Sequence, residues 1–288
     1  MTPVCRLLVS FALAVWVAAL PAQTRPGRII SIVPALTEAL FSMGAGPRVV
    51  GVGSFDRHPA EVDSLPKVGG LIDPDMEQII ALTPDLVVLY GSQEDQLAQL
   101  ERAGISVFVY AHGGLNDTLA TIRELGVRTG QRMPADALAD RIGSQITRVS
   151  NRVADQPKPR VMLVFGREPG TLSNVYASGG IGFLHDMVEA AGGDNVFAAV
   201  ARESVQLSSE SILTAAPDII IELSYDERMT PARQVAERAV WSRLPAIPAV
   251  RAGRVHLLLG NEFVQPGPRM GDATEAIARA LHPKAFQE

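Results

Sequence analysis

The sequence predicts an α/β protein of two Rossmann-like lobes with parallel central sheets, joined by one long backbone helix, with a ligand cleft between the lobes. Three features lead to this prediction: a repeated segment, an alternation of strands and helices, and one strand-free stretch. The repeat reads Glu-x-Ile-Ile/Leu-x-x-x-Pro-Asp plus an apolar strand, at 77–88 and again at 210–221. Such a separation is too long for a solenoid or propeller repeat, so it indicates two similar lobes.

Strands and helices alternate through the first lobe. The expected strands are 28–33, 49–52, 86–90 and 105–110. The expected helices begin at Pro34, near Asp73 and at Gln93. The second of these carries Glu77, and we expect Asp73 to cap it with Pro74 as its first residue. Alternation of this kind favours a parallel sheet covered by helices on both faces.

The middle of the chain contains no strand-like run from 134 to 156. Apolar residues recur there at helical spacing, at Leu138, Ile142, Ile146, Val149 and Val153. This pattern predicts one long helix with a single apolar stripe, ended by Pro157 and Pro159. We therefore divide the chain into a signal segment at 1–22, an N-terminal lobe at 28–133, a linking helix at 134–156 and a C-terminal lobe at 159–288.

The alternation resumes in the second lobe. The expected strands are 161–165, 219–223 and 255–259, and the expected helices are 182–191, one around Glu210, and 272–281. Ligands of open α/β sheets lie beyond the carboxyl ends of the strands. With two such lobes facing each other, the cleft between them is the predicted binding site.

Composition and the N-terminus narrow the class of protein. The 288-residue chain carries a net charge of −5 and no block of basic residues, which argues against nucleic acid or an anionic membrane as a partner. Arg6 precedes an apolar run at 7–20 and Pro21-Ala22 follows, the layout of a cleaved secretory signal, with an uncleaved anchor as the alternative. The only cysteine, Cys5, lies before this run, so we expect no lipid anchor there.

Several motifs in order carry a family resemblance. The first lobe opens with RIISIVPALTEALFSMGAGPRVVGVGSFDRHPAEVDSLPKVGG, and the second contains Tyr176-x-Ser178-Gly179, AGGDNVF at 191–197 and Pro268-Arg269. Together they resemble the periplasmic substrate-binding proteins of ABC importers with a helical backbone, closest to the vitamin B12-binding branch. Ferric-siderophore and haem binders are sister branches. The resemblance implies a monomeric, non-enzymatic transport receptor in the periplasm that needs no cofactor of its own.

The resemblance also implies how such a receptor meets its transporter. Each lobe of these proteins presents one glutamate to an arginine pocket on one subunit of the ABC permease dimer, and Glu77 and Glu210 stand at those positions. Two charges on two lobes would fix orientation more than affinity. The alternative is that both residues only complement the dipole of a first helical turn.

The expected ligand contacts come from loops after the strands. The resemblance places them at Pro34, Ala35, Phe55, Tyr176, and from Asn261 to Gln265. Phe55 and Tyr176 would hold a flat macrocycle, or else be core aromatics. The B12 binders carry tryptophans where this chain has Leu71 and Ser204, which departs from a corrinoid site.

Arg167 follows the first strand of the second lobe directly. A guanidinium there could pair with a phosphate or carboxylate of the ligand, or form an internal ion pair with Glu168 or Glu222. For Arg269, in the Pro-Arg motif, a structural role is expected.

Other chemistries remain as alternatives. The small-molecule ligand is expected to be a corrinoid, or else an iron chelate such as a ferric siderophore or haem. Five scattered histidines lack metal-site spacing, so bare zinc or manganese is less favoured, although His58, His112 and His185 could gather from distant loops. A secreted hydrolase is least favoured, because no nucleophile elbow or phosphate loop is present.

Overall fold

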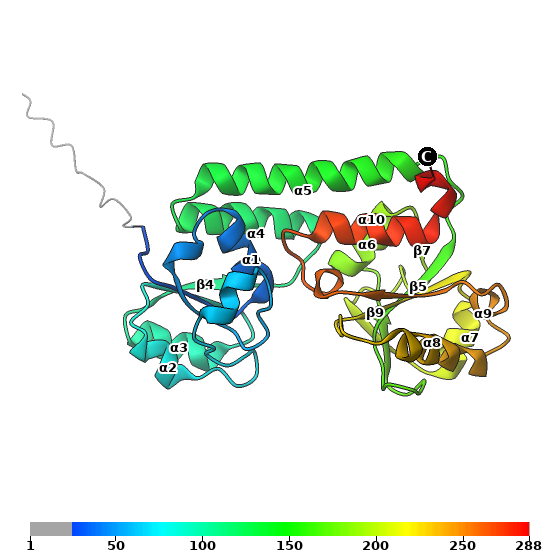
Figure 1. Ribbon diagram of the computed structural model, residues 1–288, viewed down its shortest axis with the longest axis horizontal. Coiled ribbons are helices and arrows are strands. Elements are labelled where there is room, and N and C mark those ends of the chain that lie inside the picture. The colour runs from blue at the N-terminus through cyan, green and yellow to red at the C-terminus, as the bar shows by residue number, and fades with distance from the viewer. Residues whose placement is uncertain (1–24, 288) are drawn as a thin grey trace, which may run out of the picture.

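A computed structural model describes residues 25–287, and it confirms the α/β fold with two lobes (Figure 1). The predicted signal segment at 1–22 and Cys5 lie outside the described residues. The predicted linking helix is α5, which spans Arg132–Val153 and runs along both lobes (Figure 1). Within the part of the chain described, no helix has the length and apolar character needed to span a membrane.

The N-terminal lobe contains a four-stranded, fully parallel sheet in the order β2-β1-β3-β4. Its strands are β1 (Ile29–Ser31), β2 (Val49–Val52), β3 (Leu86–Tyr90) and β4 (Ser106–Tyr110). Its helices are α1 (Pro34–Ser42), α2 (Met76–Ala81), α3 (Glu94–Arg102) and α4 (Leu115–Arg128). The expected start of α2 was wrong: its N-cap is Asp75, which accepts a hydrogen bond from the Gln78 amide, and not Asp73.

The C-terminal lobe contains a mixed sheet in the order β10-β9-β5-β6-β8, with β7 also paired to β5. The strands are β5 (Arg160–Gly166), β6 (Val175–Ser178), β7 (Asp194–Asn195), β8 (Ser204–Leu207), β9 (Ile219–Ser224) and β10 (Val255–Leu259). The expectation of a parallel sheet holds for β5, β9 and β10, but β6 runs antiparallel to both of its neighbours. The short connection from β5 to β6 allows only a hairpin, because a parallel crossover needs a dozen or more residues.

The remaining helices cover the second sheet. They are α6 (Phe183–Ala190), α7 (Ser209–Ala215), α8 (Pro231–Ala239), α9 (Pro248–Arg251) and α10 (Met270–Leu281). In the first lobe α4 packs along α5, and α10 continues the same layer in the second lobe (Figure 1). The start of α4 reaches the other lobe, where the Leu115 amide donates to Asp186 at 2.8 Å. The long helix α5 thus joins the lobes as expected, and the start of α4 adds a further contact between them.

Apolar side chains form one shared core and two separate ones. The shared core lies under α5 and joins both lobes through residues such as Leu36, Ile142 and Leu163. Each lobe has a second core on the other face of its sheet, one containing Ile79 of α2 and one containing Ile212 of α7. The shared core fixes the lobes relative to each other, while α2 and α7 lie on equivalent outer faces.

Candidate functional site: an inter-lobe cleft and two equivalent surface helices

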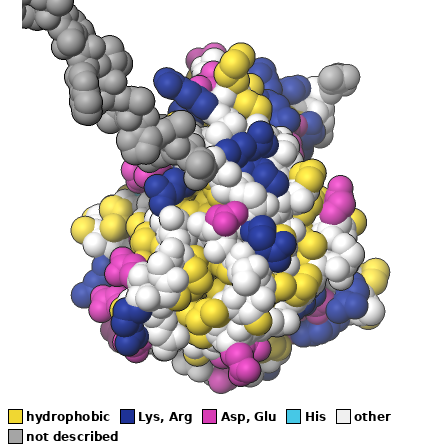
Figure 2. Space-filling model, turned by 90° about the vertical axis from the view of Figure 1, so that its left-hand side faces the viewer, with side chains coloured by type: hydrophobic (Ala, Val, Ile, Leu, Met, Phe, Trp, Pro, Cys, Tyr) yellow, Lys and Arg dark blue, Asp and Glu magenta, His cyan; other side chains and the backbone are white. Residues whose placement is uncertain are grey.

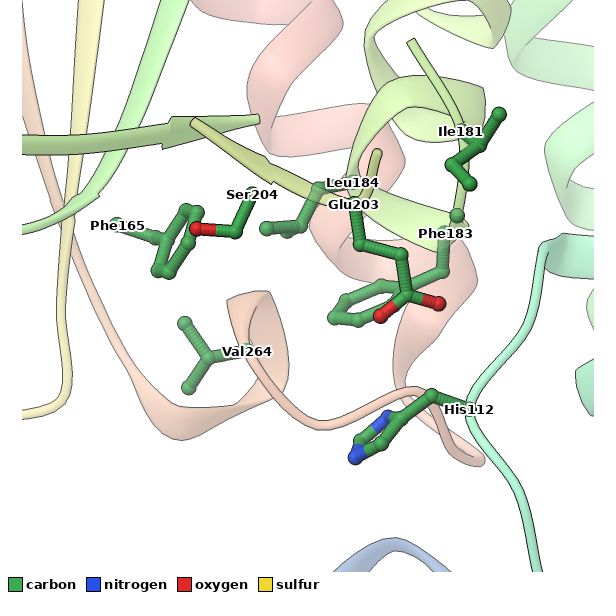
Figure 3. A pocket seen from close by; sticks show the side chains of 9 residues that line it. His112, Phe165, Ile181, Phe183, Leu184, Glu203, Ser204 and Val264 are labelled. Atoms are coloured by element: carbon green, nitrogen blue, oxygen red, sulfur yellow. The ribbon is translucent and has the colours of Figure 1, made fainter. Parts of the chain in front are cut away.

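A recess of about 230 Å³ lies at the carboxyl ends of β4 and β5, between the lobes (Figure 3). His112 comes from the segment that leaves the first lobe, and the rest of the wall from the second. Most of the lining is apolar. The lining residues are His112, Phe165, Ile181, Gly182, Phe183, Leu184, Glu203, Ser204 and Val264. A neighbouring cavity of about 300 Å³ shares Phe165 and includes Tyr225. An apolar cleft with few polar groups is the usual form of a small-molecule site.

Two tyrosines support the imidazole at the mouth of this recess. The His112 ring stacks on Tyr90, with centroids 5.7 Å apart, and meets the Tyr110 ring edge-on at 5.1 Å. Burial raises the pKa of Tyr90 to about 12 and raises that of Tyr110 as well. Both hydroxyls therefore stay neutral at physiological pH and remain able to donate or accept a hydrogen bond.

The first-lobe side of the cleft carries exposed apolar residues. Phe55 is 65% exposed, and its ring lies so close to Gly70 that a Cβ there would clash with it. Leu71 follows and is also exposed, with its carbonyl fixed by Gln93 at 3.0 Å. Tyr176 is partly exposed on β6, but it does not line the recess. Ser204, the other position of a tryptophan in the B12 binders, does line it.

The late loop crosses to the first lobe through Arg269. Its guanidinium donates to both oxygens of Glu38 on α1, at 3.0 and 2.6 Å, and to Asn261 at 2.6 Å. Asn261 is therefore buried within the protein's own network. Ala35 is buried too, packed against Gly267 of the same loop.

Three further expected contacts lie near this crossing. Pro34 is the first residue of α1 and is half-buried beside Ala35. Gln265 is half-buried, and its Oε1 is a buried atom without a hydrogen-bond partner among the described residues. Val264, its neighbour, lines the recess directly.

Arg167 lies inside the second lobe, with only 2% of its side chain exposed. Its Nη2 contacts Glu222 at 2.9 Å and Glu237 at 2.8 Å, and its Nη1 donates to the Thr171 carbonyl. Burial raises the pKa of Glu222, against the opposing effects of the Trp241 indole N–H and Arg167. These contacts correspond to the alternative of an internal ion pair with Glu222.

The two repeated helices are equivalent in atomic detail. Glu77 and Glu210 each occupy the second position of their helix, both are exposed, and neither forms an ion pair within residues 25–287. Two residues later each helix anchors a buried isoleucine, Ile79 or Ile212. The residue before each proline has positive φ, 46° at Thr83 and 42° at Ala216.

The Pro-Asp half of the repeat fastens each helix to its sheet. Asp85 Oδ2 accepts the amides of Gly27 and Arg28, both at 2.8 Å, and Asp218 Oδ2 accepts the amide of Arg160 at 3.1 Å. In return, the guanidinium groups of Arg28 and Arg160 donate to carbonyls at the end of α2 and α7. The fold thus uses the aspartates, whereas the glutamates bind nothing in the described protein.

The surface at the end of the N-terminal lobe carries mixed charge (Figure 2). Figure 2 views the end of the N-terminal lobe, where charges of both signs are interspersed among apolar and uncharged side chains. Within residues 25–287, no group of three or more His, Cys, Asp and Glu side chains is arranged to hold a metal ion.

Among the recess residues of the second lobe, Ser204 and Val264 fall at positions noted in the sequence. Phe165, Phe183 and Glu203 belong to no motif that was recognised. His112 had a usable signal, because it lies two residues beyond the end of a strand, at the edge of the sheet where ligands bind.

Two lobes with an apolar cleft between them are the architecture of a ligand receptor. The family model described as periplasmic binding protein matches residues 29–259. The chain therefore belongs to the periplasmic binding protein family and is an ABC transporter substrate-binding protein, a non-enzymatic component that acts outside the cytoplasmic membrane. Binding proteins of this family deliver their ligand to an ABC permease.

Individual relatives extend over nearly the same length. The chain is 30% identical to a vitamin B12-binding protein of Salmonella typhimurium, over 93% of each chain. It is 29% identical to an uncharacterised ABC transporter substrate-binding lipoprotein of Bacillus subtilis, over 92% of this chain and 83% of the relative. Among solved structures, a periplasmic heme-binding protein of Roseiflexus sp. RS-1 in apo form superimposes with a TM-score of 0.76 at 26% identity, covering 90% of this chain and 98% of that one.

Proposed function

We propose that this protein binds a metal-containing tetrapyrrole, a corrinoid in the first instance, between its lobes and passes it to an ABC permease. The observation that carries the ligand class is the apolar recess at the carboxyl ends of β4 and β5, together with the exposed Phe55 ring on the loop after β2. A flat macrocycle gains from apolar and aromatic walls. The similarity to a vitamin B12-binding protein over 93% of the chain favours a corrinoid.

A haem is the second candidate, and a specific observation favours it. The positions that hold tryptophan in the B12 binders carry Leu71 and Ser204, and a histidine stands at the mouth of the recess. In this proposal Phe55, Leu71, Ser204 and Gln265 contact the ligand and Tyr176 lies at the rim. The loops around the cleft are held in place by Pro34, Ala35 and Asn261. Arg167 stabilises the second lobe from inside, through Glu222 and Glu237.

Docking to the permease uses Glu77 and Glu210, one for each subunit of the dimer. The support for this is the equivalence of α2 and α7, since both carboxylates are exposed at the same helical position while the fold makes no use of either. Two separated carboxylates favour one register and one orientation on a partner that has two-fold symmetry.

Titration of the purified protein with aquocobalamin, haem and a ferric siderophore tests the ligand class. Binding of any of them should quench the fluorescence of Trp241, because these chelates absorb light at its emission wavelengths. Quenching by a corrinoid at the lowest concentration is the expected result. The absence of quenching by all three would contradict the proposal and would reopen binding of bare zinc or manganese.

A further inference from the structure

His112 is the residue lining the recess that carries a basic nitrogen. The rest of the lining is apolar apart from Glu203 and Ser204. In Figure 3 the imidazole extends from the segment after β4 into the open space that Phe183 and Val264 face. His112 is exposed, so its ring is open to a ligand that enters the recess.

The ring is held in one orientation by the protein. Tyr90 stacks on one face, Tyr110 contacts an edge, and the Tyr110 hydroxyl lies 3.5 Å from Nδ1. In the tautomer in which Nδ1–H donates to this oxygen, Nε2 keeps its lone pair at the outer tip of the ring. A hydrogen bond from the second ring nitrogen to an oxygen is the arrangement that orients a metal-binding histidine.

We infer that His112 Nε2 is an axial ligand to the metal of the transported chelate. The inference rests on the proposed function and adds to it the kind of ligand: an iron or cobalt macrocycle with an axial position that is open or held by exchangeable water. Imidazole nitrogen suits both metals. On binding, the nitrogen lone pair forms the bond to the metal, one water leaves, and no electron is transferred.

This role separates His112 from residues that only shape the recess. Removal of a wall residue weakens every flat ligand alike, whether or not it contains a metal. Removal of an axial ligand weakens only chelates whose metal can accept a nitrogen, and it also changes the absorption spectrum of the bound metal. The two roles are therefore distinguishable with paired probes.

The test compares wild type, His112→Ala and His58→Ala. His58 is a matched control, since it also follows a strand of the first lobe, is partly exposed, and lies outside the recess. Two pairs of probes are used. Ferric protoporphyrin, whose iron can accept a nitrogen ligand, is paired with metal-free protoporphyrin. Diaquocobinamide, whose axial waters can be exchanged, is paired with dicyanocobinamide, whose axial positions are filled. Affinities come from fluorescence quenching and coordination from the visible absorption spectrum.

We expect the wild type and the His58 variant to show the spectrum of a nitrogen-ligated metal with ferric protoporphyrin or diaquocobinamide. His112→Ala should lose this spectrum and bind that probe roughly tenfold or more weakly. Its affinity for the metal-free or dicyano partner should stay within about twofold of wild type.

Two results would overturn the inference and are distinguishable from each other. If wild type binds the chelates but His112→Ala keeps the same spectrum, or weakens both members of a pair equally, His112 is only part of the wall and the proposed function still stands. If Glu203 instead of His112 bound the metal, the spectrum of the His112→Ala variant would be unchanged. If wild type binds none of the probes, the proposed function itself fails, and the inference fails with it.

Discussion

Arg269 joins the lobes by a two-pronged contact with Glu38, in which Nε and Nη2 donate to the two carboxylate oxygens at 3.0 and 2.6 Å. The residues are 231 positions apart, one at the start of α10 and one on α1. A second inter-lobe pair, His58 with Glu227 at 3.8 Å, lies on the same side of the cleft. The Arg269–Glu38 pair therefore helps to fix the angle between the lobes, together with the shared core under α5, whereas the His58 contact is a long one between exposed side chains and contributes little.

Replacement of Arg269 by Ala should lower the free energy of unfolding by about 2–3 kcal/mol. Glu38 would be left buried without its partner, and the cost stays below that of a fully buried pair because the Arg269 side chain is 28% exposed. Urea denaturation measures the change. Asp140→Asn, which removes an exposed partner of Arg123, serves as control and should change stability by less than about 0.5 kcal/mol. Equal effects in both variants would show that the inter-lobe pair contributes little.

Replacement of Arg167 by Met should destabilise the protein by about 3–5 kcal/mol, because it leaves Glu222 and Glu237 as two neighbouring buried carboxylates with only the half-exposed Arg233, 3.9 Å from Glu237, as a remaining cation. The change in urea midpoint measures this, with ligand affinity measured in parallel. Normal stability combined with a large loss of affinity would contradict the internal role and return Arg167 to the ligand site.

Much of the fold could be predicted from local patterns. β2, β3 and β10 match the expected ranges, since each is a short apolar run between clear turn signals. The apolar stripe from Leu138 to Val153 predicted α5 because a long helix repeats its signal many times. In contrast, β8 is a mostly exposed strand with the sequence SVQL, and nothing local separates such a segment from a loop.

The site could be predicted only where it follows a repeated or strand-end motif. Glu77 and Glu210 could be proposed as docking residues because the chain carries the same segment twice. The roles of Arg269 and Asn261 depend on Glu38, which lies more than 220 residues earlier in the chain, and no spacing rule connects them. Arg167 had two possible partners in the sequence, and only the packing of α8 against β10 brings Glu237 to it as a third.

Asp56 should make stability fall as pH rises. Its carboxylate is fully buried next to Phe55, and both of its oxygens lack a partner in the described part of the chain. Burial raises the pKa of Asp56 from 3.8 to about 7. The folded protein thus holds the proton more tightly than the unfolded chain, so stability is lost as pH rises from about 4 to about 7 and is constant above that.

The variant Asp56→Asn isolates this effect because it removes the charge and keeps the shape. Its free energy of unfolding, relative to wild type, should increase by roughly 2–3 kcal/mol between pH 5 and pH 8. Urea denaturation at the two pH values measures the difference. A gap that does not change with pH would show that Asp56 is ionised in the folded protein at both values.

The two aspartates of the repeat should differ in their effect on stability. Asp85 accepts two backbone amides and Asp218 accepts one, so Asp85→Asn should cost about 1–2 kcal/mol more than Asp218→Asn. Both variants should leave ligand affinity unchanged, since neither residue lies in the cleft. Thermal or urea unfolding gives the comparison, and a larger cost for Asp218→Asn would contradict this account of the repeat.

Ligand uptake by cells that carry Glu77→Ala and Glu210→Ala together tests the central claim most directly. Glu94→Ala, another exposed first-turn glutamate but one without a counterpart in the repeat, is the control. We predict that the purified double variant keeps wild-type affinity and stability while uptake is lost, with an intermediate loss for each single change and none for the control. Uptake at the wild-type rate in the double variant would contradict the claim that these two glutamates dock the protein to its permease.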